Sequence, residues 1–195
     1  ATLLAVILVF RQRVWKLILA LVHWIGRKAD DEDRIHLRLI LILIVATVIT
    51  AVIGIGIDEF IAPGENIKLV SSLFLVTAAI LLISSRITPK ERDYGDLKLK
   101  DALITGFAQG LGVFPGISRS GITISAGIFA GLKREEAGEF SFLLSIPAIL
   151  GAAVLKLRDL GDLSSSIGAA ALSMGMIVSF ASGVLALVFL MRLVR

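Results

Sequence analysis

The chain has 195 residues, of which 56% are hydrophobic, and it carries a formal net charge of +4 without a single cysteine. The lack of cysteine excludes disulfides, zinc–thiolate sites and a cysteine nucleophile. The basic residues lie beside long uncharged runs and do not alternate with aromatic residues, so they indicate membrane topology rather than nucleic-acid binding. We therefore expect an all-α, polytopic membrane protein that binds no nucleic acid.

The N-terminal part combines an apolar run with an amphipathic segment. Residues 1–10 are apolar but too few to span a bilayer, and basic residues follow them directly. Segment 14–25 places its apolar side chains on one helical face and carries Trp15 and Trp24. This pattern is typical of a helix that lies in the membrane interface.

An acidic run, 30–33, separates this segment from the next apolar stretch. It lacks the spacing of a calcium loop, so we expect a solvated loop that supplies negative charge to the start of a helix. His23 and His36 have no second metal ligand at helical spacing. We expect both histidines to be solvated at the interface, without a metal or catalytic role.

Four uncharged stretches predict membrane-spanning helices. They occupy residues 39–57, 69–85, 140–155 and 163–191. About 20 apolar residues cross the ~30 Å hydrocarbon core, and shorter helices are accommodated by thinning of the bilayer. The basic stretch 86–100 is then cytoplasmic, whereas the Pro63-Gly64 turn and the bases Lys68, Lys156 and Arg158 lie outside.

Residues 101–138 contain two apolar segments that are too short to span. Segments 101–113 and 122–132 both adjoin basic residues of cytoplasmic type. Together they predict a re-entrant helix–turn–helix, whose turn must lie against protein or a water-filled cavity because irregular backbone is not tolerated in lipid. The glycines Gly106, Gly110 and Gly112 do not follow a strand, so close helix packing explains them better than nucleotide binding.

The turn of this hairpin reads Pro-Gly-Ile-Ser-Arg-Ser-Gly-Ile-Thr at 115–123. A charged side chain at membrane depth indicates a functional site, and the Arg119 guanidinium fits a phosphate. Gly116 and Gly121 would let backbone N–H groups approach a ligand, at the positive end of a helix that starts near Ile122. The hydroxyls of the turn complete a predicted phosphate site: Ser118, Ser120 and Thr123. The alternative is a plain loop in which Arg119 reaches the headgroups.

The sequence 109–125, Gln-Gly-Leu-Gly-Val-Phe-Pro-Gly-Ile-Ser-Arg-Ser-Gly-Ile-Thr-Ile-Ser, resembles the second signature of the undecaprenyl-diphosphate phosphatase family of the bacitracin-resistance type. The sequence Glu-Phe-Ser-Phe-Leu-Leu-Ser-Ile-Pro at 139–147 fits the same family, and the similarity of layout covers essentially the whole chain. The PGxSRSGxT core is specific in a membrane context.

The resemblance implies a multi-pass enzyme of the cell (plasma or inner) membrane that hydrolyses undecaprenyl diphosphate, a polyprenyl diphosphate lipid. Its product, undecaprenyl phosphate, is the lipid carrier for cell-wall synthesis. The resemblance also implies two inverted repeats, each with a re-entrant hairpin, and a divalent cation such as Mg²⁺ or Ca²⁺, whose ligands are not identifiable in this chain. Homodimerisation, the membrane face to which the site opens and the general base are left open.

The chain departs from the family at its N-terminal side. The family's first signature, a glutamate-rich stretch followed by Pro, paired Ser, Thr, Gly and His, has no match in residues 1–100. We therefore expect a single membrane domain, 1–195, that belongs to a longer protein and carries half of a site. The acid and base groups would come from the other half.

Within this half, we expect Arg119 to clamp phosphate oxygens. Ser118 or Ser120 could be a covalent nucleophile, but no activating base adjoins them, which favours phosphate binding. The resemblance implies that Gln109 corresponds to a family glutamate in the other inverted repeat, so it could orient phosphate or water. A hydrogen bond between packed helices is an equally consistent role for Gln109. Glu139 is a further candidate, although a charge at a helix start explains it better. Ser141 and Ser145 are interpreted as packing residues.

Two functions remain open at this stage. The first is hydrolysis of the lipid diphosphate, and the alternative is a transporter or flippase for a polyprenyl phosphate that uses the same midplane anion site. An acid or base group that faces Arg119 would distinguish them. A purely structural membrane subunit would leave the Ser-Arg-Ser turn unexplained.

Overall fold

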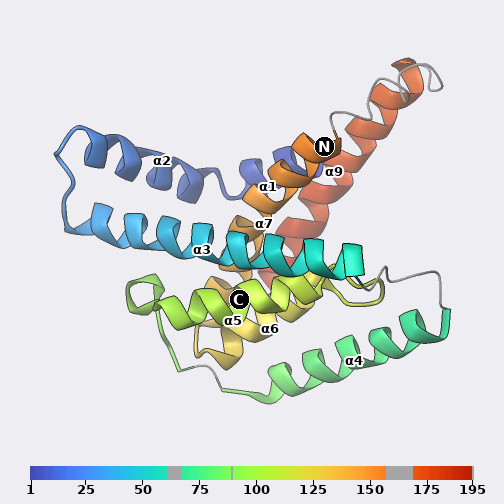
Figure 1. Ribbon diagram of the computed structural model, residues 1–195. Coiled ribbons are helices and arrows are strands. Elements are labelled where there is room, and N and C mark those ends of the chain that lie inside the picture. The colour runs from blue at the N-terminus through green and yellow to red at the C-terminus, as the bar shows by residue number, and fades with distance from the viewer. Residues whose placement is uncertain (61–66, 89, 157–168, 195) are drawn as a thin grey trace.

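The computed structural model describes residues 1–60, 67–88, 90–156 and 169–194, and all regular elements in these ranges are helical. The elements are α1 Thr2–Val9, α2 Arg11–Ile25, α3 Asp31–Phe60, α4 Ile67–Arg86, the 3₁₀ turn η1 Tyr94–Asp96, α5 Leu99–Leu111, α6 Arg119–Phe129, α7 Arg134–Lys156 and α9 Ala169–Val194 (Figure 1). The predicted all-α fold class is confirmed.

Within these ranges, four helices are long and apolar enough to cross a membrane. They are 31–57 in α3, 67–86 in α4, 134–154 in α7 and 170–193 in α9. These helices match the four predicted stretches. The predicted outer turn at Pro63-Gly64, Arg158 and the side chain of Lys156 lie outside the described residues. The membrane orientation and the inverted repeats stay predictions.

The start of α3 is fixed by the acidic run. Asp33 N–H donates to Asp30 Oδ1 at 2.8 Å, and Asp30 N–H donates to Asp33 Oδ2 at 3.2 Å. This reciprocal pair satisfies two amides that a helix start leaves free. The predicted negative charge at the helix start is present, but residues 31–33 are not a solvated loop, because they form the first turn of α3 and Asp33 is buried. The Asp33 carboxylate also contacts His23 Nδ1 at 2.8 Å.

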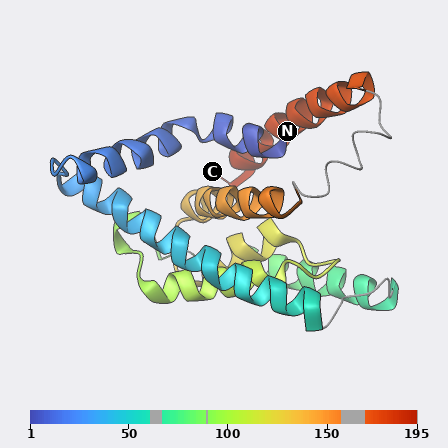
Figure 2. The same ribbon diagram turned by 45° about the horizontal axis from the view of Figure 1, so that its top comes forward.

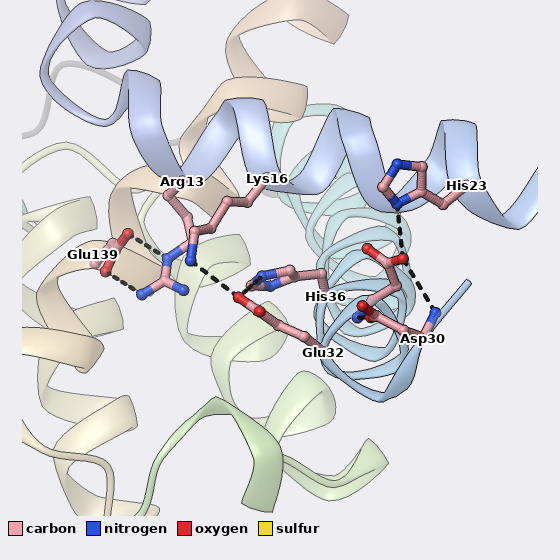
Figure 3. A network of polar contacts seen from close by, with 8 residues as sticks. Arg13, Lys16, His23, Asp30, Glu32, His36 and Glu139 are labelled. Atoms are coloured by element: carbon pink, nitrogen blue, oxygen red, sulfur yellow. Dashed lines mark hydrogen bonds and ion pairs between the residues drawn. The ribbon is translucent and has the colours of Figure 1, made fainter. Parts of the chain in front are cut away.

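A further prediction about this region is wrong. His36 is not solvated: it is buried, and neither ring nitrogen makes a hydrogen bond in the described part of the chain, although Nε2 lies 3.7 Å from Glu32 Oε1 (Figure 3). The reason is that α2 packs alongside the N-terminal turns of α3 (Figure 1).

The core brings the short helices against the long ones. α5 packs along α3, α6 packs against α5 and α7, and α7 lies between α6 on one side and α1 with α9 on the other (Figure 2). Gly106 and Gly110 make the α3–α5 contact possible, since an added Cβ would lie 2.7 Å from Ala46 O at the first and 2.7 Å from Ile53 Cβ at the second. The interpretation of these two glycines as packing residues is confirmed.

The hairpin forms at the predicted place, with different bounds. α6 begins at Arg119 rather than near Ile122, because Ser118 takes the N-cap position and its Oγ accepts from Gly121 N–H at 3.2 Å. Serine is among the preferred N-cap residues, and this bond satisfies one of the helix's free amides. Arg119 and Ser120 therefore stand in the first turn of a helix and not in a loop.

A network of polar contacts ties the base of the hairpin together. Arg92 donates to the Asp101 carboxylate at 2.8 and 3.3 Å, to Asp96 O at 2.6 Å and to Ala130 O. The hydrogen bond to Asp101 raises the pKa of Arg92 above its ordinary value. Because Asp101 belongs to α5 and Ala130 follows α6, Arg92 links both helices of the hairpin to the preceding loop.

Candidate functional site

A cavity of about 550 Å³ lies where α1, α5, α6, α7 and α9 meet. One part of its wall is polar and comes from α5, α6 and α7. The remainder is apolar and comes mainly from α1 and α9. The lining residues are Thr2, Val6, Gln109, Gly112, Arg119, Ser120, Ser141, Phe142, Ser145, Ile149, Gly183, Ala186, Leu187 and Leu190.

Arg119 brings a positive charge to this cavity. It is the first residue of α6, and Gly112 at the end of α5 closes up against it, since a Cβ added to Gly112 would lie 2.9 Å from Arg119 Cα. No hydrogen bond or ion pair within the described residues engages the Arg119 guanidinium. Its five N–H donors are thus available to an anion, and neighbouring Ser120 adds a hydroxyl to the same wall.

Gln109 is the most deeply buried of the predicted site residues, with 0% of its surface exposed. Its Nε2 donates to Thr50 Oγ1 at 3.4 Å and to Leu144 O at 3.5 Å, while Oε1 has no partner in the described part of the chain. An unsatisfied buried polar atom costs ~1–3 kcal/mol. Gln109 borders the cavity, but Oε1 itself is closed off from solvent, so a molecule in the cavity would reach this atom only after the side chain shifts.

Sequence reasoning missed the contribution of α7. Ser141 and Ser145 both line the cavity, although their sequence pattern favours packing residues. The Ser145 hydroxyl also donates to Phe142 O at 2.7 Å. Their spacing of four residues, which places both on one helical face, was the signal that could have identified them.

The other turn residues have contacts within the protein and do not line the cavity. Ser118 caps α6, its backbone N–H donates to Thr77 Oγ1 at 3.2 Å, and Gly121 N–H is the donor to the cap. Thr123 is buried, and its hydroxyl donates to Arg119 O. The roles of Ser118, Gly121 and Thr123 in phosphate binding stay predictions.

The backbone conformation and packing of Gly116 explain why this position holds a glycine. Its φ of +94° is a left-handed conformation, and a Cβ would lie 2.4 Å from Val70 O of α4. Its carbonyl oxygen accepts from Thr77 Oγ1 at 3.0 Å. Gly116 therefore lets the turn close against α4, and Thr77, which sequence reasoning did not single out, holds it there through two hydrogen bonds.

Glu139 lies apart from Arg119, in a second cavity of about 380 Å³ at the ends of α1, α2, α7 and α9. Arg13 donates to both of its carboxylate oxygens, at 2.8 and 3.3 Å (Figure 3), and also lies 4.7 Å from the centroid of the Tyr94 ring. Burial lowers the pKa of Arg13, but the bond to Glu139 and its negative charge outweigh burial and raise it. The 126 intervening residues hid this pair from sequence reasoning.

A stacked pair of rings stands between the two cavities. Phe10 and Phe142 have centroids 5.6 Å apart; Phe10 lines the cavity of Glu139, and Phe142 lines the cavity of Arg119. The Glu139 carboxylate is thus engaged by Arg13 on the far side of this pair, which makes it a poor acid or base for a reaction beside Arg119.

The predicted divalent cation has no fitting ligands in the described residues. No group of three His, Asp or Glu side chains gathers there as a metal site would require, and the cavity is lined by hydroxyls and an amide without a carboxylate. Mg²⁺ and Ca²⁺ favour carboxylates among their oxygen ligands. The donor set therefore does not fit such an ion, and no step below uses one.

Comparison with known proteins finds one family model and relatives that share one name. The family model described as "Bacitracin resistance protein BacA" matches residues 1–195. The undecaprenyl-diphosphatase of Treponema denticola is 45% identical over 195 residues, which cover 100% of this chain and 72% of that protein. The undecaprenyl-diphosphatase of Corynebacterium glutamicum strain ATCC 13032 is 38% identical, over 97% of this chain and 65% of that protein.

A third relative, undecaprenyl-diphosphatase 2 of Halalkalibacterium halodurans, is 37% identical over 100% of this chain and 71% of its own length. The chain thus spans between 65% and 72% of the length of these three curated relatives.

Proposed function

Because the chain belongs to the bacitracin resistance protein BacA family, we propose that its protein hydrolyses undecaprenyl diphosphate to undecaprenyl phosphate and inorganic phosphate in the cell membrane. In this reaction the P–O bond of the terminal phosphate breaks and water supplies the oxygen that the released phosphate gains. The reaction would return a lipid carrier to cell-wall synthesis. The observation that carries the proposal is the unpartnered Arg119 guanidinium in a cavity with one polar and one apolar wall.

The polar wall suits the diphosphate group. Phosphoryl transfer depends mainly on positioning and on stabilising negative charge. Arg119 can donate two parallel N–H bonds to phosphate oxygens, a geometry that fixes orientation as well as charge. Ser120 contributes a hydroxyl beside it, and Gln109 contributes its amide from the cavity floor.

The apolar wall suits the prenyl chain. Val6 of α1 and Leu187 and Leu190 of α9 line the side of the cavity that faces away from the hairpin. Burial of apolar surface gains roughly 25 cal/mol per Å², so the first prenyl units would add affinity that inorganic diphosphate lacks. An amphiphilic cavity of this kind favours a lipid diphosphate over a soluble one.

The activating base is not among the described lining residues. None of them carries a carboxylate or an imidazole. A serine nucleophile needs such a base within hydrogen-bond reach, so we assign Ser120 to phosphate binding. Ser118, whose hydroxyl caps α6, is the weaker candidate for a contact with substrate. The same lack of a base favours the transporter or flippase as the second candidate function.

Phosphate release separates the two functions. The protein, expressed from its complete natural gene in detergent, would be given a polyprenyl diphosphate with Mg²⁺ or Ca²⁺ and, separately, with chelator. The 195-residue chain would be assayed in parallel. Release of one phosphate per lipid by the complete protein supports the phosphatase. If neither sample releases phosphate but the lipid binds and Arg119→Ala abolishes binding, the transporter is supported and the phosphatase is rejected.

A further inference from the structure

A third cavity lies at the corner between α2 and α3, far along the chain from the hairpin. A cavity of about 440 Å³ opens there, lined by Trp24, Arg27, Ala29, Arg34 and Leu37. Two guanidiniums beside an indole ring are the groups that bind phosphate and stack on an apolar neighbour. Neither the proposed activity nor the matched family description assigns a role to this corner.

Arg27 occupies a backbone position that ordinarily favours glycine. The Arg27 N–H donates to Trp24 O at 3.1 Å, and the Lys28 N–H donates to His23 O at 2.8 Å. These two bonds close the C-terminus of α2 in a Schellman motif. Arg27 holds the left-handed conformation of this motif, with a φ of 55°. Glycine adopts that conformation without strain, whereas a residue with a Cβ does not. Strained residues cluster at functional sites, so the arginine at this position motivates a functional hypothesis.

Arg27 is a cation of the corner that lines the cavity and has no ion pair within the described residues. The four acids of the run 30–33 are engaged: Asp30 and Asp33 cap α3, Glu32 pairs with Lys16 at 3.0 Å, and Asp31 pairs with Arg34 at 3.0 Å. The Asp31–Arg34 ion pair is largely exposed, so it contributes little to stability. The Arg34 guanidinium can therefore leave Asp31 and bind a phosphate. No bond within the described residues engages the Arg27 side chain.

The sequence pattern predicts that this corner lies at the level of the membrane surface. α2 exposes a row of large apolar side chains, and Trp24 itself is 62% exposed. The apolar part of α3 begins at Leu39, little more than one helical turn after Arg34. At ~1.5 Å of rise per residue, Arg34 stands ~7 Å outside the hydrocarbon, which is the depth of lipid headgroups. Tryptophan is enriched at that depth.

We propose that Arg27, Arg34 and Trp24 form a binding site for the phosphate headgroup of an anionic phospholipid. The guanidiniums bind the phosphodiester, and the indole packs on the glycerol and the upper acyl chains. Basic residues near the surface of the cytoplasmic leaflet are attracted to its anionic lipids, and the predicted topology puts this corner on that side. The site acts independently of the proposed hydrolysis.

The test uses a substitution whose two effects have opposite signs. In Arg27→Gly, the left-handed position is relieved, so the melting temperature in lipid-free detergent rises by roughly 2 °C. The same variant binds phosphatidylglycerol ~5-fold more weakly, because the cavity loses one of its two lining guanidiniums. Lys28→Gln removes the adjacent cation, which does not line the cavity, and is the matched control. Native mass spectrometry counts bound lipids while thermal unfolding gives the stability.

The expected result is that phosphatidylglycerol raises the melting temperature of the wild type and of Lys28→Gln, and has little effect on Arg27→Gly. Phosphatidylcholine should raise none of them. Equal phosphatidylglycerol binding by Arg27→Gly and wild type would overturn the proposal. It would also fail if inorganic phosphate reproduced the whole Arg27-dependent shift, because the site would then bind a soluble anion.

Discussion

Arg119 and Arg92 adjoin the same hairpin of α5 and α6, yet their surroundings are opposite. Arg92 has four hydrogen bonds to Asp101, Asp96 and Ala130, and every one of its acceptors belongs to the protein. Arg119 has no such partner in the described residues and lines a cavity instead. The difference shows that the role of an arginine in this fold depends on its hydrogen-bond partners. An arginine whose donors are all bonded to the protein stabilises the fold, and one whose donors are free is available to a ligand.

The largest expected effect is on turnover at Arg119. Arg119→Lys keeps the positive charge but loses the planar pair of donors, and lysine does not replace a bidentate guanidinium. We expect a ~10²–10³-fold loss in the rate of phosphate release, the range seen when one donor to a developing oxyanion is removed. Initial rates with a polyprenyl diphosphate measure it. A wild-type rate in Arg119→Lys would show that Arg119 does not act as a bidentate clamp on phosphate.

The next largest effect is on stability at Arg92. Arg92→Ala leaves the Asp101 carboxylate, which is 1% exposed, without its cation. Breaking a buried pair costs ~3–5 kcal/mol, which corresponds to a fall of roughly 10 °C in melting temperature. Changing both partners together, as Arg92→Met with Asp101→Leu, should recover part of the loss because no buried charge remains unpaired. A melting temperature unchanged in Arg92→Ala would contradict a structural role.

A smaller effect on turnover is expected at the amide and hydroxyl of the cavity. Gln109→Leu and Ser141→Ala each remove a polar group worth ~1–2 kcal/mol to a bound phosphate, so rates should fall about 10-fold. Stability should hold in Gln109→Leu, since its orphaned Oε1 disappears with the amide. Ser125→Ala is the matched control, because Ser125 is buried against Ser84 Oγ at 3.0 Å and does not line the cavity. Equal losses in all three variants would indicate general damage to the fold.

At Thr123 the expected effect is smaller still. The sequence motif includes this hydroxyl in the phosphate site, whereas the structure bonds it to Arg119 O within α6. Thr123→Val keeps the shape and removes the hydroxyl. We expect less than a threefold change in the rate of phosphate release, because one intramolecular hydrogen bond contributes only ~0.5–1.5 kcal/mol. A loss as large as that of Arg119→Lys would return Thr123 to the site.

The smallest effect concerns pH. The Lys133 ammonium donates to Asp93 at 2.6 Å and lowers the pKa of that carboxyl, and the same bond raises the pKa of Lys133. The pair therefore stabilises the loop fully between about pH 5 and pH 9, given unfolded values of ~3.9 and ~10.4. Its contribution is lost as pH falls through the lowered pKa of Asp93 or rises through the raised pKa of Lys133. The melting temperature of Lys133→Gln should therefore lie slightly below that of wild type near neutral pH, and the two should converge at strongly acidic and strongly basic pH. A difference of the same size below about pH 3 would refute this.

Much of the fold was predictable because it depends on local pattern. The uncharged runs fix the long helices by length alone, and two segments too short to span, joined at Pro115-Gly116, fix the hairpin. The start of α6 was less predictable: the Ser118 hydroxyl predicts a phosphate contact, which stays a prediction, and the structure shows that the same hydroxyl is the N-cap acceptor of α6. Sequence alone does not show which of the two uses a serine has.

The candidate site was predictable only in part. Arg119 was identifiable from its charge within an apolar segment. The contribution of Ser141 and Ser145 and the pairing of Arg13 with Glu139 depend on how α7 packs against α1, α2 and α6. Such contacts between residues far apart in the chain follow from tertiary packing, which no local pattern encodes.

The most direct test of the contrast between the two arginines is one paired measurement on Arg119→Lys and Arg92→Lys. Phosphate release per folded molecule and melting temperature would be recorded on the same detergent preparation, expressed from the complete natural gene. We predict that Arg119→Lys loses turnover at an unchanged melting temperature. Arg92→Lys should have a lower melting temperature, while the rate of phosphate release per folded molecule stays the same. Turnover kept in Arg119→Lys, or lost in both variants together with stability, would contradict it.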